Sequence, residues 1–183
     1  NLDNWMYLTY DPVRFRYTNG TMKIDTMASG TSGQWGVTHD NYGRLYFTSA
    51  GGENPVRGVQ INPAYGRLDF PDQINASFQE VWPIIATPDV QGGEKRLRTD
   101  LTLNHFTACA GQSIYRGDKL PQDLVGDYLI CEPVGRLIRR AKVINVKGKT
   151  LFENAYNKEE FIASTDMNFR PVNSATGPDG NLY

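Results

Sequence analysis

The chain has 183 residues, which is long enough for one domain with a hydrophobic core. Its formal net charge of −1 gives no indication of the basic footprint of a nucleic-acid-binding protein or of a polybasic membrane patch. The strongly apolar stretches, such as residues 81–86, are far too short to span a bilayer, so no transmembrane segment is predicted.

The rest of the composition is typical of a β-rich domain with many turns. Aromatic residues favour strands, glycine and proline favour turns, and the chain has 10 Tyr, 8 Phe, 3 Trp, 18 Gly and 10 Pro. We expect a domain that is truncated at both ends, because it begins at Asn1 and stops at Tyr183 within what reads as a new strand.

Short strands and tight turns fill the first fifty residues. Strands are predicted over residues 7–10, 13–17, 22–27, 35–39 and 45–49. Asn19-Gly20 is a strong hairpin signal between the second and third of these, and residues 40–43 form a turn between the last two. This part of the chain is therefore predicted to form antiparallel hairpins.

Residues 50–104 are predicted to be a loop-rich insertion, because prolines and paired glycines interrupt every run of strand formers. A stretch this long without regular structure is usually functional or an insertion. Two interpretations stay open: a surface excursion, or a lid or rim beside a substrate site.

The second half predicts four consecutive strands, over residues 107–115, 128–132, 137–145 and 150–154. Single helical turns are predicted at 121–125 and 158–163. Four antiparallel strands in about 50 residues is the size of one propeller blade. Gly43-Arg-Leu-Tyr46 and Gly180-Asn-Leu-Tyr183 each follow an acidic turn, a weak repeat. We therefore predict an all-β fold of antiparallel four-stranded sheets, about three blades of a β-propeller over residues 1–183.

Several segments resemble a known family. They are QWGV at 34–37, HFTACAGQSIYRGDKLP at 105–121, LICEP at 129–133, LIRR at 137–140, STDMNFRPV at 164–172 and GPDGNLY at 177–183. These are similar to segments of bacterial membrane-bound dehydrogenase-like propeller proteins, relatives of sorbosone dehydrogenase and soluble quinoprotein glucose dehydrogenase. The resemblance covers about half of the chain.

The resemblance implies a six-bladed propeller in the periplasm, at the cell surface or secreted. It implies pyrroloquinoline quinone with calcium as cofactors, and a c-type haem in a further downstream domain. The haem would need a Cys-x-x-Cys-His motif, and this sequence has only two cysteines, 22 positions apart. The cofactor ligands of the quinoproteins have no clear match here, and no metal site is predicted.

Propellers place their active sites where loops enter the innermost strands. The residues at these positions are Gln34 and Trp35, Asn104 and His105, and Asp166, Phe169 and Arg170. If the blades are assigned correctly, these three clusters meet at one mouth of the channel.

The candidate site residues have the chemistry that a quinone-dependent dehydrogenase needs. His105 would be the base, Asp166 a carboxylate, Arg170 a cation for an anionic or carbonyl oxygen, and Trp35 an aromatic platform. The alternatives are structural: His105 as a hydrogen-bonded buried residue, and Arg170 as the ion-pair partner of Asp166 or Asp179.

Two functions follow. The first is a quinone-dependent sugar or polyol dehydrogenase that passes electrons to an acceptor or to other subunits of a cell-envelope assembly. The second is a non-catalytic propeller that acts as a binding or scaffold subunit of a secreted or cell-surface assembly.

The two cysteines are predicted to form a disulfide. If the strands at 107–115 and 128–132 pair so that facing residue numbers sum to about 240, Cys109 and Cys131 lie almost opposite each other. The oxidising compartment that the resemblance implies would preserve the bond. The alternative is a pair of buried free thiols.

Overall fold

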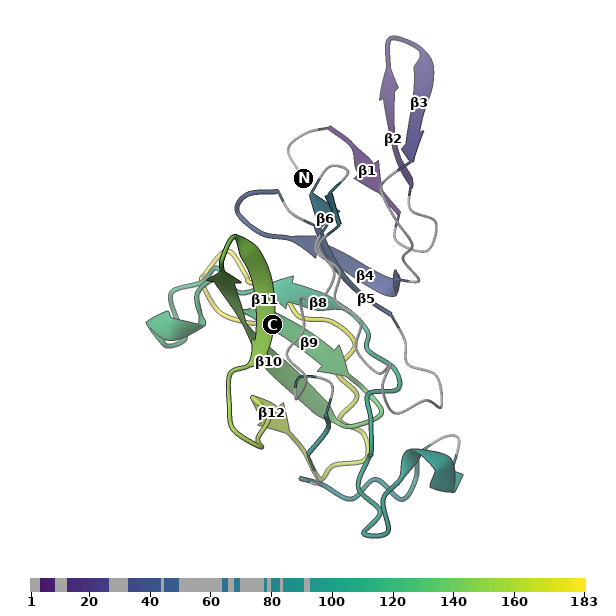
Figure 1. Cartoon of the computed structure of the whole chain (residues 1–183), viewed down its shortest axis with the longest axis vertical. Coiled ribbons are helices and arrows are strands. Elements are labelled where there is room, and N and C mark those ends of the chain that lie inside the picture. Colours follow the sequence, from purple (N-terminus) through teal and green to yellow (C-terminus); the bar gives the residue numbers. More distant parts are fainter. Residues whose placement is uncertain are drawn as a thin grey trace.

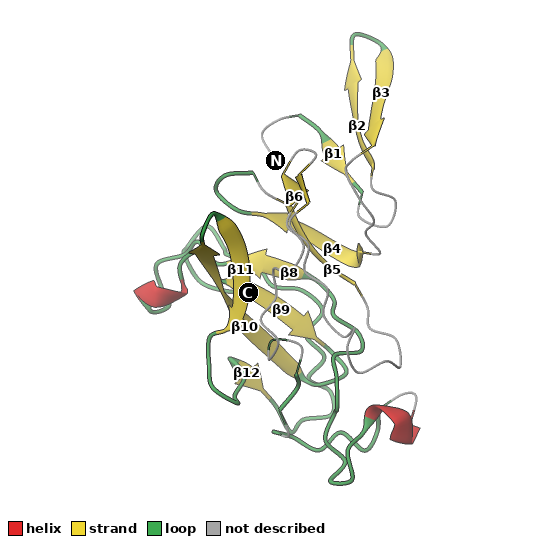
Figure 2. Ribbon diagram, in the orientation of Figure 1, coloured by secondary structure: helices red, strands yellow, loops and turns green. Residues whose placement is uncertain are grey.

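The computed structural model of the chain describes residues 4–8, 13–26, 33–43, 45–49, 64–65, 68–69, 78, 80–82, 84–90 and 93–183. In this part the regular structure is almost entirely antiparallel β-sheet (Figures 1 and 2), which confirms the predicted all-β class. Two short 3-10 helices are described, η1 (Gly93–Arg96) and η2 (Gln122–Leu124), the second at a predicted helical turn. No helix in the described ranges has the length and apolar character needed to cross a membrane.

The first sheet is a three-stranded meander. Its strands, in sheet order, are β1 (Met6–Tyr7), β2 (Val13–Thr18) and β3 (Thr21–Thr26). The predicted Asn19-Gly20 hairpin is confirmed: both residues have positive φ, 50° and 76°, as a two-residue turn of this type requires. Arg14 pairs across the hairpin with Asp25 at 2.7 Å.

The second sheet has four strands in sequence order. They are β4 (Gly33–His39), β5 (Leu45–Ser49), β6 (Ala64–Tyr65) and β7 (Leu68–Asp69). In the turn before β5, the Asp40 carboxylate accepts hydrogen bonds from the Tyr42 backbone N–H at 2.9 Å and the Tyr46 hydroxyl at 2.8 Å. An acidic residue in this turn therefore has a structural role.

The third sheet contains the predicted four consecutive strands. They are β8 (Gln112–Ile114), β9 (Tyr128–Glu132), β10 (Leu137–Val146) and β11 (Lys149–Asn154). The predicted helical turn at 158–163 is wrong, because β12 (Ile162–Ala163) pairs with the start of β10 beyond the point where β11 ends.

In the third sheet, β8, β9 and the first half of β10 are buried on both faces, and side chains alternate between two cores. Tyr128 and Ile130 of β9 face the first core, where Tyr46 packs edge-on against Phe152 with ring centroids 5.4 Å apart. Leu129 of β9 belongs to the second core. This alternation is the period-2 pattern of an extended strand.

Neighbouring parts of the chain pack against the β8 edge of this sheet from both sides. From one side, the Gln112 side-chain amide donates to the Tyr46 carbonyl at 3.4 Å, which links β8 to the second sheet. From the other side, the Ser113 and Ser174 hydroxyls are 2.7 Å apart. Adjacent strand residues point to opposite faces, so β8 lies between the second sheet and residues 172–174.

A buried arginine attaches the loop-rich stretch to the third sheet. Arg139 of β10 forms a fully buried ion pair with Glu160, and it also donates to the Phe78 carbonyl and, at 2.9 Å, to the Glu80 carbonyl. Its guanidinium lies 4.4 Å from the centroid of the Phe106 ring. Phe78 itself is in the first core. The described part of the insertion is therefore integrated into the fold and is more than a surface excursion.

The predicted disulfide is wrong, because Cys109 and Cys131 are both free, buried thiols. The register pairs Gln112 with Ile130, so facing residue numbers sum to 242 rather than 240. Cys109 precedes the regular part of β8, where the backbone turns its side chain into the first core, whereas Cys131 belongs to the second. The sheet therefore separates the two thiols.

We predict that truncating Arg139 is strongly destabilising. Arg139→Met leaves the Glu160 carboxylate buried and uncompensated, which costs about 3–5 kcal/mol. Arg14→Met, which removes a half-exposed pair, is the matched control and should cost at most about 1 kcal/mol. Chemical denaturation of the full-length protein measures both. Equal losses for the two variants would contradict the anchoring role of Arg139.

We also predict two slowly reacting thiols and no disulfide. Burial raises the pKa of Cys131 from 9.0 to about 11, so its thiolate is about 100-fold scarcer at neutral pH than that of an ordinary cysteine. Thiol titration without reductant should detect both cysteines quickly in the unfolded protein and slowly in the native one. A non-reduced, unfolded protein with no titratable thiol would restore the disulfide.

Candidate functional site

The predicted site residues of the first cluster lie in β4. Gln34 and Trp35 are within this strand, but their side chains lie outside the described part of the structure. The position of β4 is clear from its neighbour, since the α-carbon of Gly36 faces Gly111, just before β8. The strand that contains Gln34 and Trp35 therefore lies next to Gly111, which follows the second predicted cluster, Asn104 and His105, in the chain.

His105 is fully buried. Its Nδ1 contacts the Asn104 side-chain oxygen, and its backbone forms an antiparallel bridge with Glu80. An imidazole with no solvent exposure cannot reach a substrate in this conformation. The arrangement therefore corresponds to the structural alternative for His105.

Asp166 and Phe169 belong to one exposed turn. The Asp166 carboxylate accepts the Asn168 backbone N–H at 2.8 Å, and its carbonyl accepts the Phe169 N–H at 3.1 Å. The Ser164 hydroxyl in turn accepts the Asp166 N–H at 3.1 Å. Asp166 is thus the residue that closes this turn.

Arg170 pairs with Asp89 rather than with Asp166 or Asp179. Its guanidinium donates to the Asp89 carboxylate at 2.6 Å and to the Pro133 carbonyl at 3.0 Å. Arg136 bonds the other oxygen of Asp89, and these hydrogen bonds, that of Arg136 first, lower the pKa of the Asp89 carboxyl. Arg170 therefore ties the loop-rich stretch to the turn after β9.

These contacts do not fit a quinone site. The base is buried, and the carboxylate and the guanidinium are engaged in local structure. Calcium takes six to eight oxygen ligands, and the described residues contain no cluster of three or more acidic, histidine or cysteine side chains. We therefore derive no catalytic step through pyrroloquinoline quinone or calcium.

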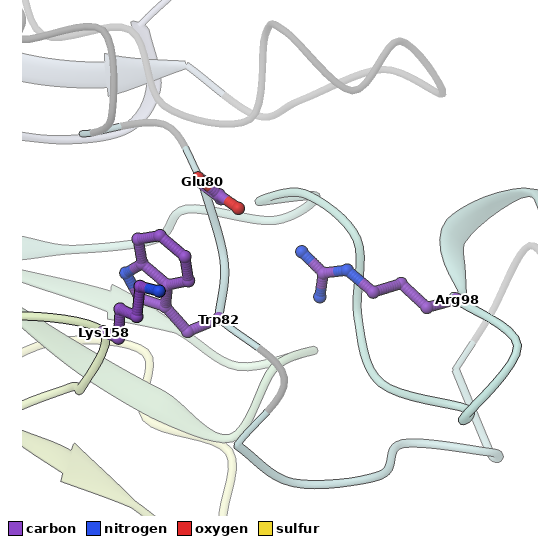
Figure 3. A pocket seen from close by; sticks show the side chains of 4 residues that line it. All are labelled: Glu80, Trp82, Arg98 and Lys158. Carbon is purple, nitrogen blue, oxygen red and sulfur yellow. The ribbon is translucent and has the colours of Figure 1, made fainter.

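The structure contains an open pocket that sequence reasoning did not identify. It has a volume of about 400 Å³ and is lined by Glu80, Trp82, Arg98 and Lys158 (Figure 3). Three of these four residues come from the loop-rich stretch, and Lys158 comes from the segment between β11 and β12. Its volume is in the range of small-molecule sites, which starts at about 300 Å³.

The pocket has one aromatic wall. Trp82 is half-buried, and the Lys158 ammonium lies 5.5 Å from the centroid of its ring, a cation–π distance. Lys158 is held in the left-handed backbone region at φ 60°. The tryptophan is followed by a proline, and an aromatic residue among charged ones in a loop is the only signal that the sequence offers for this site.

Arg98 is positioned by backbone carbonyls. Its guanidinium donates to the Leu103 carbonyl at 2.6 Å and to the Val81 carbonyl, while its own N–H donates to the Thr102 carbonyl at 2.8 Å. A guanidinium fixed in this way loses little conformational freedom when a ligand binds.

Glu80 is exposed, and its backbone is fixed at two points. Its carbonyl accepts a hydrogen bond from Arg139, and the same residue bridges to His105. The buried residues His105 and Arg139 thus hold the backbone of Glu80, which lines the pocket. His105 therefore positions a residue of the pocket without lining it.

Comparison with known proteins gives one family. The sequence matches, over residues 2–183, the family described as a domain of unknown function, DUF7133. Neither the curated proteins nor the solved structures contain a match. Because the match spans nearly the whole sequence, this chain belongs to the DUF7133 family.

Proposed function

We propose that the chain is about three blades of a six-bladed β-propeller. The support is the packing of consecutive meanders: the second sheet covers one face of the third, and residues 172–174 cover the other. Residues 175–183 form a further hairpin, in which Thr176 bridges to Leu182. Radial stacking of antiparallel sheets in chain order is the propeller arrangement.

Within this architecture, we propose that the protein binds a sugar or polyol as a non-catalytic propeller module. One observation carries the proposal: the pocket places the Trp82 ring beside three charged side chains in an open cavity of about 400 Å³. A sugar ring has an apolar C–H face that packs on an aromatic ring, and hydroxyl groups around its edge that hydrogen-bond to polar neighbours. The family resemblance supports the same ligand class and a periplasmic, cell-surface or secreted location.

The second candidate is a quinone-dependent sugar or polyol dehydrogenase. The observation that favours it is that three segments lie close together. One of them, β4, contains the first predicted cluster, and the other two follow the second and third clusters in the chain. β4, the Gly111–Ser113 segment and residues 172–174 contact one another in that order. The contacts of His105 and Arg170 described above favour the binding module.

We predict that Trp82→Ala weakens sugar binding by the full-length protein. Loss of the aromatic wall should reduce affinity about tenfold, equivalent to roughly 1.4 kcal/mol. Trp5→Ala is the matched control, because Trp5 contacts Arg14 and Arg16 in the first sheet and is not part of the pocket. Calorimetric titration with monosaccharides and polyols measures the effect. Equal affinities of the two variants for any sugar that binds would rule out this pocket.

A turnover assay separates the two functions. The full-length protein, supplied with pyrroloquinoline quinone, calcium and an artificial electron acceptor, should bind a sugar or polyol without reducing the acceptor. Acceptor reduction that depends on both the quinone and the sugar would instead establish the dehydrogenase.

A further inference from the structure

We infer that the ligand of this pocket is an acidic sugar, a monosaccharide or terminal residue that carries one carboxylate. The inference rests on the proposed function and narrows its ligand class. It follows from the charges that line the pocket, from the way that they are held, and from the shape of the aromatic wall.

The pocket has an excess of one positive charge. Arg98 and Lys158 are cationic and Glu80 is anionic, and among the described residues only Trp82 joins them in lining the cavity. A ligand with a single negative charge therefore neutralises the pocket. A dianionic phosphate ester would overcompensate this charge and would meet repulsion from the Glu80 carboxylate.

Five arginines of the described structure form ion pairs with carboxylates; the set is Arg14, Arg136, Arg139, Arg140 and Arg170. Arg98 is outside this set, as is Arg116, which donates to the Asn41 side-chain oxygen and to the His39 carbonyl. Arg98 is instead held by the neutral carbonyls of Val81 and Leu103.

Hydrogen bonds from Thr102 lower the pKa of the Asp100 carboxyl, and the nearby Arg98 charge lowers it further, although the two side chains form no ion pair. Both the N–H and the hydroxyl of Thr102 donate to the Asp100 carboxylate, at 3.0 and 2.6 Å. No ion pair joins Arg98 or Lys158 to a carboxylate within the described ranges. The two cations of the pocket are thus available to an anionic ligand.

The side chains are arranged around a ligand-sized space. Figure 3 shows the Arg98 guanidinium directed into the pocket from one side and Trp82 with Lys158 on the other, with Glu80 between them. A sugar ring packed against Trp82, beside the Lys158 ammonium that lies over this ring, would direct its carboxylate toward the cations, where charge-assisted hydrogen bonds form. The Glu80 carboxylate, an acceptor only, is suited to a ligand hydroxyl.

The test compares three ligands by calorimetric titration of the full-length protein. Glucuronate has the ring and one carboxylate, glucose has the ring alone, and acetate has the carboxylate alone. We expect glucuronate to bind at least tenfold more tightly than either of the others, and added salt to weaken glucuronate binding alone. Glucose 6-phosphate, a dianion, should bind more weakly than glucuronate.

Substitution of Lys158 provides a second test of the inference. Lys158 is exposed and has only the Trp82 ring as a described partner, so Lys158→Gln should fold normally and reduce the preference for glucuronate over glucose at least fivefold. Lys147→Gln is the matched control, because Lys147 is also exposed and also has positive φ, 50°, but lies in the β10–β11 turn. Arg98→Lys, which keeps the charge and loses the planar fork, should give an intermediate preference.

The outcomes separate the two proposals. Equal affinity for glucose and glucuronate, or an unchanged preference in Lys158→Gln, would overturn the acidic-sugar inference and leave the sugar-binding function standing. Binding of acetate as tight as that of glucuronate would show an anion site that does not recognise sugars. No binding of either sugar would overturn both proposals.

Discussion

The buried guanidinium of Arg139 is the interaction on which the rest of this structure depends. Charged groups are costly to remove from water, and Arg139 and Glu160 are both fully enclosed. The cost is offset because every direction of the guanidinium fork is used: a carboxylate on one side, two backbone carbonyls on another and aromatic rings above. These partners come from three separate parts of the chain, so one side chain fixes the loop-rich stretch on the third sheet and, through Glu80, fixes one wall of the pocket.

A second buried charge organises the entrance to β8. The Glu132 carboxylate accepts backbone hydrogen bonds from Thr107, Ala108 and Val134, at 3.0–3.2 Å. Burial raises the pKa of its carboxyl, and these N–H groups partly oppose that rise. The segment between His105 and β8 has no regular ladder, so the carboxylate satisfies backbone donors that a strand partner would otherwise satisfy. Where the strands are interrupted, a buried polar side chain thus makes the backbone hydrogen bonds that a neighbouring strand would otherwise make.

The sequence was informative where structure is local. Turn chemistry and alternation predicted the Asn19-Gly20 hairpin and the four strands of the third sheet to within a few residues, because both depend on neighbours in the chain. A two-residue difference in the pairing sum moves Cys109 out of direct opposition to Cys131, and the irregular backbone before Gln112 places its side chain in the other core. No local pattern specifies that register.

Long-range contacts explain what the sequence could not predict. Arg139 pairs with Glu160 and donates to the Phe78 and Glu80 carbonyls. Arg170 pairs with Asp89, which is 81 positions away. The pocket unites Glu80 and Arg98 with Lys158, which is 60 or more residues further along the chain. The side chains for which the motifs predicted chemistry, His105 and Arg170, make contacts that hold neighbouring parts of the fold together.

The alternation of β9 between two cores has a consequence for how such a chain diversifies. Even-numbered positions such as Tyr128 and Ile130 contact material that precedes the sheet in sequence, and odd-numbered ones such as Leu129 and Cys131 contact material near or after it. Each face of β9 therefore packs against a different part of the chain. A substitution on one face therefore changes the packing of one core and leaves the neighbours of the other core in place, so the two sets of β9 positions are constrained by different parts of the chain.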